Sequence, residues 1–220
     1  MNRIKYIAFV IVFLIGSAVQ AQLENDQDIS KVGTTAAQFL KISSGGRGLA
    51  MGSANVAITN NLSSSFWNPA GLAHLKGIQV YFENNGWLAG TDYNFGSFGF
   101  EWPRVGVLSL SITMLTTPDD LVRTIENPTG TGEKFNAQDM SIGISIGKSL
   151  TNQLSLGASI KNIRQRIWHS TGQTIATDIG VQYKTPIKDI ILGASIANFG
   201  NDISLIGRDM NLSVDPDPNN

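Results

Sequence analysis

Few residues of this chain have types and a spacing that could support catalysis or metal binding. The two histidines, His74 and His169, lie far apart in the 220-residue sequence, and neither belongs to a cluster with the spacing of metal ligands. We interpret both as polar residues of a loop or of a packed segment. The chain has no cysteine, which excludes a thiol nucleophile, a disulfide framework and a cysteine-based zinc site.

Three short motifs resemble binding sites but each lacks a required part. Residues 45–48 (GGRG) lack the Lys-Ser/Thr of a phosphate-binding loop, and residues 215–218 (DPDP) lack the Gly and Glu of a calcium loop. Asp119 and Asp120 follow a proline, so an exposed turn is the default interpretation and a paired-carboxylate site the alternative. We therefore expect a protein that is not an enzyme and holds neither a cofactor nor a metal.

Arg164 and Arg166 lie where the alternation of a predicted strand slips, so they could face either an enclosed interior or a loop. Asp178, on the next predicted strand, could offset one of these charges. Structural charge pairing is the simpler interpretation, and guidance of a substrate is the alternative.

The composition favours a surface in contact with lipid. Charged residues make up 15% of the chain, against roughly 25% in soluble domains, and there are 23 glycines. The net charge of -1 gives no basic face, which excludes nucleic acid as an expected partner.

Residues 1–21 have the pattern of a secretory signal peptide. Arg3 and Lys5 precede the apolar run 6–15, and small residues lead to a predicted cleavage site after Ala21. A membrane-anchoring helix is the alternative, but it would need about 20 apolar residues. Export is therefore expected, and residues 22–32 are interpreted as a disordered linker.

Residues 76–200 alternate between apolar and small side chains with a period of two. About seven strands follow from this pattern. They are centred on residues 78–83, 93–102, 107–114, 140–147, 154–161, 175–183 and 192–196.

A membrane barrel explains these strands better than a soluble β-sandwich. The non-apolar face carries Ser, Gly and Thr instead of the charges of a solvated sheet, and aromatic residues gather at strand ends. The predicted connections alternate between long (84–92, 116–137, 168–173) and short (103–104, 148–153, 185–189). The expected fold is all-β, an antiparallel transmembrane β-barrel.

Residues 33–75 break this pattern and are interpreted as a short helical plug inside the barrel. A short apolar helix is expected within residues 36–42, and Asn68 before Pro69 predicts a helix cap followed by proline at the first helical position. The candidate plug or gate residues are Arg47, Met51, Trp67, Asn68, Pro69 and Leu72.

The predicted strand count is odd, whereas bacterial single-chain barrels have an even number of strands. The tail, residues 201–220, has no convincing further strand and contains Pro216 and Pro218. The sequence therefore predicts a truncated, partial barrel.

Three blocks of the predicted plug, residues 34–42 (TTAAQFLKI), 46–54 (GRGLAMGSA) and 67–73 (WNPAGLA), resemble the N-terminal signature of the PorV/PorQ family of FadL-like outer-membrane barrels. The resemblance extends over about residues 32–200. It implies a barrel of about fourteen strands with an N-terminal plug, located in the outer membrane of a two-membrane bacterium.

The same resemblance implies two functions from different classes. In type IX secretion, some family members bind the signal domain of exported cargo proteins and pass it to other secretion components. FadL itself conducts long-chain fatty acids, so a channel for hydrophobic small molecules is the alternative. Both imply outer-membrane lipid as a partner.

Overall fold

The computed structural model describes residues 36–187 and 190–207, which belong to one compact unit beginning at Ala36. The predicted signal peptide, the linker 22–32, residues 33–35 and residues 208–220 of the tail lie outside the described residues. Within those ranges, no helix is both long and apolar enough to cross a membrane.

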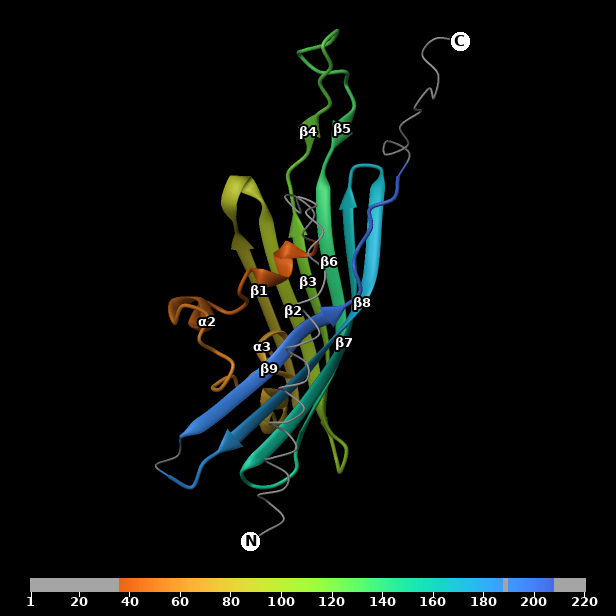
Figure 1. The fold of residues 1–220 in the computed structure, drawn as a ribbon. Helices are drawn as coiled ribbons and strands as arrows, with labels where there is room; N and C mark the ends of the chain where they lie inside the picture. The colour runs from red at the N-terminus through yellow and green to blue at the C-terminus, as the bar shows by residue number, and fades with distance from the viewer. Residues whose placement is uncertain (1–35, 188–189, 208–220) are drawn as a thin grey trace, which may run out of the picture. The chain divides into compact units, whose positions relative to one another are not determined.

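The fold is a seven-stranded, fully antiparallel sheet whose strands pair in sequence order (Figure 1). The number of strands agrees with the predicted alternation, and the all-β prediction is confirmed. Among the described residues the sheet is open, with β1 and β9 at its two edges. The strands are β1 (Ile78–Gly86), β2 (Asp92–Trp102), β3 (Gly106–Thr116), β6 (Ala137–Ser149), β7 (Leu154–Ile167), β8 (Ser170–Lys184) and β9 (Ile191–Gly200).

A separate two-stranded hairpin interrupts the connection between β3 and β6. It consists of β4 (Asp120–Leu121) and β5 (Lys134–Phe135), and in Figure 1 it extends beyond the ends of the neighbouring strands. We call the end of the sheet with this hairpin the loop end, and the opposite end, with connections 103–105, 150–153 and 185–190, the turn end.

One predicted long loop is wrong. The connection between β7 and β8 is only Trp168–His169, because Ser170 to Gln173 continue β8 and pair with β7. These residues form a strand without apolar side chains, so alternation of hydrophobicity could not reveal them. The connections at the loop end are therefore longer than those at the turn end mainly because of residues 117–136.

The two faces of the sheet differ in chemistry and in exposure. One, the apolar face, carries large hydrophobic side chains that remain exposed, for example Val80 at 75%, Ile144 at 59% and Ile179 at 64%. The other, the packed face, carries mainly small polar side chains that are buried. These include Ser97, Ser109, Ser111, Thr113, Ser141, Ser145, Ser155 and Ser159. The sheet is thus inverted relative to a soluble protein, in which apolar side chains are buried.

Residues 36–75, the N-terminal segment, cover the packed face. The segment forms four short helices, η1 (Gln38–Lys41), α2 (Gly46–Ala50), α3 (Ser64–Trp67) and η2 (Pro69–His74). A further helix, η3 (Leu88–Gly90), lies in the β1–β2 connection. The predicted short helix near 36–42 is the 3₁₀ helix η1, and η2 begins at Pro69 as predicted.

Two small hydrophobic clusters hold the N-terminal segment on the sheet. Phe39 and Leu40 of η1 pack with Ile163 of β7 and Ala176 of β8. Leu62, Leu72 and Leu75 pack with Val107 of β3. Phe66 of α3 adds an edge-to-face contact with the buried Phe95 of β2, with 6.1 Å between the ring centroids. Close backbone approach and hydrogen bonds supply the remaining attachment.

Candidate functional site

Asn68 is the centre of the contact between the N-terminal segment and the sheet. Its side chain is fully buried, and its Oδ1 accepts a hydrogen bond from the backbone N–H of Ala70 at 3.0 Å, which caps η2. Its Nδ2 donates to the carbonyls of Val56 at 2.9 Å and of Val181 in β8 at 3.1 Å. The predicted cap is confirmed, and the same side chain also joins two parts of the segment to a strand.

A row of three glycines on the packed face receives this turn. Gly147, Gly157 and Gly180 lie directly opposite one another on β6, β7 and β8. A Cβ at Gly147 would lie 2.7 Å from the Cβ of Leu72, one at Gly157 would overlap the backbone of Pro69, and one at Gly180 would overlap the Asn68 amide. The glycine row therefore allows the backbone of η2 to approach the sheet more closely than any side chain would permit.

Trp67 connects this turn to the preceding part of the segment. Its indole Nε1 donates to the carbonyl of Ser44 at 2.8 Å, and its own carbonyl accepts from Ser195 Oγ of β9 at 3.0 Å. A Cβ at Gly48 would lie 2.8 Å from the Trp67 ring, so α2 packs directly against the indole.

Glu83 of β1 holds the loop that precedes α2. Its Oε2 accepts hydrogen bonds from the backbone N–H of Gly45 at 2.6 Å, from Ser44 Oγ at 3.0 Å and from Tyr81 Oη at 3.3 Å. Sequence reasoning missed Glu83, whose only signal is its place on the packed side of an alternating strand.

The six predicted plug or gate residues do not form a single cluster. Trp67, Asn68, Pro69 and Leu72 come together over β6, β7 and β8, with all but Trp67 fully buried. Arg47 is exposed on α2, and Met51 is half-buried at its end.

A buried ion pair on the packed face was also missed. Lys161 Nζ of β7 lies 2.6 Å from Asp178 Oδ2 of β8, with side-chain exposures of 7% and 2%. Asn198 of β9 completes the group, since its Oδ1 accepts from Lys161 Nζ at 3.1 Å and its backbone N–H donates to Asp178 Oδ1 at 2.7 Å. The predicted pairing of Asp178 with Arg164 or Arg166 is wrong, because those arginines lie on the opposite face of a strand whose register is regular.

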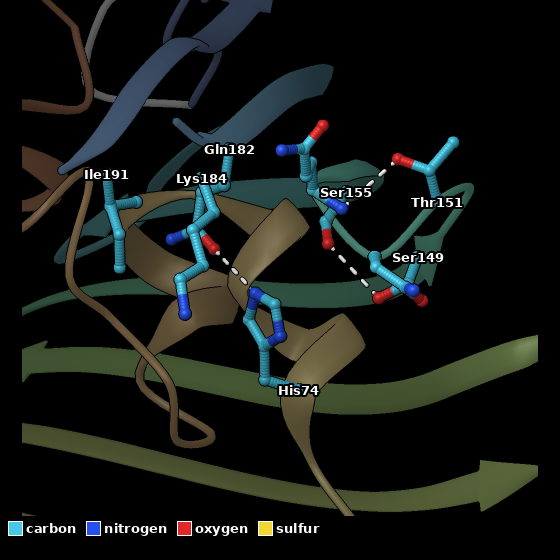
Figure 2. A pocket seen from close by; sticks show the side chains of 9 residues that line it. His74, Ser149, Thr151, Ser155, Gln182, Lys184 and Ile191 are labelled. Atoms are coloured by element: carbon cyan, nitrogen blue, oxygen red, sulfur yellow. Dashed lines mark hydrogen bonds between the residues drawn. The ribbon is translucent and has the colours of Figure 1, made fainter. Parts of the chain in front are cut away.

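His74 borders a cavity of about 190 Å³ at the turn end, lined mainly by residues with polar side chains (Figure 2). The His74 Nε2 lies 3.1 Å from Gln182 Oε1, and Ser149 Oγ lies 3.1 Å from Ser155 Oγ. The Gln182 side chain also donates to the carbonyls of Ala57 and Thr59, so this cluster fastens the segment to β8.

The remaining candidates lie in exposed connections at the loop end. Asp120 pairs with Arg123 at 3.3 Å, and the backbone N–H of Leu121 together with Arg123 lowers the pKa of the Asp120 carboxyl. His169 Nε2 lies 3.8 Å from Glu133 Oε1. Among residues 36–187 and 190–207, no three His, Cys, Asp or Glu side chains are grouped so that they could hold a metal ion.

Neither the protein-family models nor the curated proteins match this chain. The resemblance to the PorV/PorQ family therefore stays a prediction from the sequence blocks. Of those blocks, residues 67–73 contain the turn that Asn68 fastens to β8.

Proposed function

We propose that this chain is an outer-membrane β-barrel protein of the PorV/PorQ type, without catalytic activity, that binds secreted proteins. The inverted sheet is the observation that carries the proposal. An apolar face of this extent is rare on a soluble monomer, where a contiguous exposed patch usually covers a few hundred Å². Contact with lipid removes the cost of exposing it, whereas the buried polar face is typical of a barrel interior.

Membrane insertion also requires every backbone group in the lipid to be hydrogen-bonded. An open edge in hydrocarbon leaves N–H and C=O groups unsatisfied, at several kcal/mol each. We therefore propose that further strands cover the edges β1 and β9 in the membrane and close the sheet. The N-terminal segment would then be the plug, since it occupies the packed face.

The membrane proposal is tested by phase separation in a detergent that forms a separate phase on warming. The exported protein is expected in the detergent phase after the membranes are dissolved. Recovery in the aqueous phase without detergent would instead support a soluble secreted protein and would refute the proposal.

The connection 117–136 supports the binding of secreted proteins. It extends beyond the sheet and carries the hairpin β4–β5 (Figure 1). Most of its residues are polar or charged. Ile125, 96% exposed, is an apolar side chain at a position suited to contact with a partner protein.

A photo-reactive amino acid at Ile125 is expected to crosslink exported proteins in living cells. The matched control is the same substitution at Leu150, which is 53% exposed at the turn end. Equal labelling at both positions, or none at either, would contradict docking at the loop end.

A channel for hydrophobic small molecules is the second candidate. It is the alternative implied by the resemblance to FadL-like barrels; the structure offers it a cavity of about 50 Å³ whose lining is mainly polar and includes the candidate gate residue Arg47. A hydrophobic ligand would need a larger opening than this cavity. Conduction would require the N-terminal segment to leave the glycine row. Uptake of a labelled fatty acid by cells that express the protein tests this candidate, and uptake equal to that of empty cells would exclude it.

A further inference from the structure

Two arginines form a basic recess on the apolar face, near the loop end. Arg164 and Arg166 of β7 lie directly opposite Met140 and Gln138 of β6, and these four side chains line a cavity of about 320 Å³. The volume is at the lower end of the range usual for ligand sites. Among the described residues, no carboxylate lines this recess.

The recess lies where the apolar face becomes polar. Towards the loop end, the side chains of β7 on this face change from Leu156, Ala158 and Ile160 to Asn162, Arg164 and Arg166. The neighbouring strand β8 changes at the same level, because Ile175 lies opposite Asn162 and Gln173 opposite Arg164. In the membrane proposed above, such a boundary coincides with the lipid headgroups, where arginine is tolerated at little cost.

The described residues offer the two arginines a neutral partner and no direct ion pair. Arg166 Nη2 donates to Asn136 Oδ1 at 2.9 Å, and Asn136 Nδ2 in turn donates to Asp119 Oδ1 at 2.8 Å. These two hydrogen bonds orient Arg166 through a neutral amide, and among the described residues its remaining N–H groups have no carboxylate acceptor. Within the described residues, neither guanidinium has a carboxylate at ion-pair distance.

We propose that Arg164 and Arg166 bind the phosphate group of a membrane lipid. The proposal rests on the membrane location proposed above. Two guanidinium groups on one face offer planar, paired N–H donors, the geometry that suits phosphate oxygens. The source is a lipid rather than free phosphate, because Ile142 and Ile175 lie in the row next to the recess, on either side of Asn162, and Ile160 follows in the row beyond. Acyl chains would pack against these side chains.

The test measures lipid retention by native mass spectrometry of the full chain in detergent micelles. The probes are phosphatidic acid and diacylglycerol with the same acyl chains, so they differ only in the phosphate. We expect preferential retention of phosphatidic acid and a loss of about tenfold in that preference for R164Q/R166Q. R164K/R166K keeps the charge but not the paired donors, so its preference for phosphatidic acid should lie between those of the unchanged protein and R164Q/R166Q.

R123Q is the matched control, because Arg123 lies at the same end but pairs with Asp120 in the exposed connection. Equal loss in R123Q, or an unchanged preference in R164Q/R166Q, would overturn the proposal. Displacement of phosphatidic acid by millimolar inorganic phosphate would overturn the assignment to a lipid. If the protein enters phosphatidylcholine vesicles while R164Q/R166Q retains lipid normally, only this inference fails; if it enters no vesicle, the membrane proposal fails.

Discussion

Replacement of Asn68 by alanine should release the N-terminal segment from the sheet. The substitution removes the cap of η2 and two donor groups, those that reach the carbonyls of Val56 and Val181. Asn68→Asp is a sharper version, because the carboxylate keeps the acceptor for the Ala70 N–H but turns two attractive contacts into repulsive ones.

The expected cost follows from these contacts. A lost cap costs about 1 kcal/mol, and each of the two lost hydrogen bonds about 1 kcal/mol more. Their sum, about 3 kcal/mol for Asn68→Ala, corresponds to opening of the segment about a hundredfold more often. Asn68→Asp should exceed this value, since a charge in a buried site without a counter-ion is costlier than a missing amide.

Hydrogen exchange monitored by mass spectrometry measures this opening in the peptide that covers residues 62–75. The amides of Gly71 and Leu75, bonded to the carbonyls of Asn68 and Leu72, report on η2. The control Asn84→Ala removes an exposed bond to Asn94 and should change exchange in this peptide by less than about twofold. Unchanged exchange in Asn68→Ala, or slower exchange in Asn68→Asp than in Asn68→Ala, would refute the reasoning.

Three further predictions concern the sheet itself. Gly157→Val should displace η2, because the new side chain would overlap the Pro69 backbone. Trypsin should then cleave faster after Lys76. The control Gly86→Val, which has open space around it, should leave the cleavage rate unchanged. Lys161→Met should lower the free energy of unfolding by about 3–5 kcal/mol in urea titrations, because it leaves the buried Asp178 carboxylate unpaired. K161M/D178N should recover most of this loss, since no buried charge is then left unpaired. A double variant as unstable as Lys161→Met would contradict this prediction. In lipid vesicles, Ile144→Arg should lower the free energy of unfolding by about 2–4 kcal/mol, because it places a charge on the apolar face. Leu150→Arg, at the turn end, should leave this free energy almost unchanged. Equally small effects of both substitutions would place the apolar face outside lipid.

Local patterns in the sequence predict the strands and the two faces, because side-chain alternation is a property of each strand alone. The cap at Asn68 was predictable for the same reason, as Asn before Pro depends on neighbouring residues only. The start of β8 was not predictable, since Ser170 to Gln173 contain no apolar residue that would mark a face.

Contacts between strands depend on register, which alternation does not supply. Ser159 lies directly opposite Asp178. Lys161 is two residues further along the same face of β7, so its side chain reaches Asp178 diagonally. Sequence reasoning instead connected Asp178 with Arg164 and Arg166, whose even-numbered positions lie on the other face. Ile160, Arg164 and Arg166 all have even numbers, so strict alternation along the strand would have placed them on the same face.

The small residues of the packed face and the turn of the N-terminal segment depend on each other. Without the glycine row, the turn at Asn68 and Pro69 could not approach the strands; without the turn, the glycine row would leave a space lined by backbone. The backbone of β8 participates directly, because the carbonyl of Val181, next to Gly180, accepts from Asn68. A change at Gly180 and one at Asn68 therefore disturb the same contact. Their effects on the opening of residues 62–75 should be strongly non-additive, with the double variant G180A/N68A opening little more than the worse single variant.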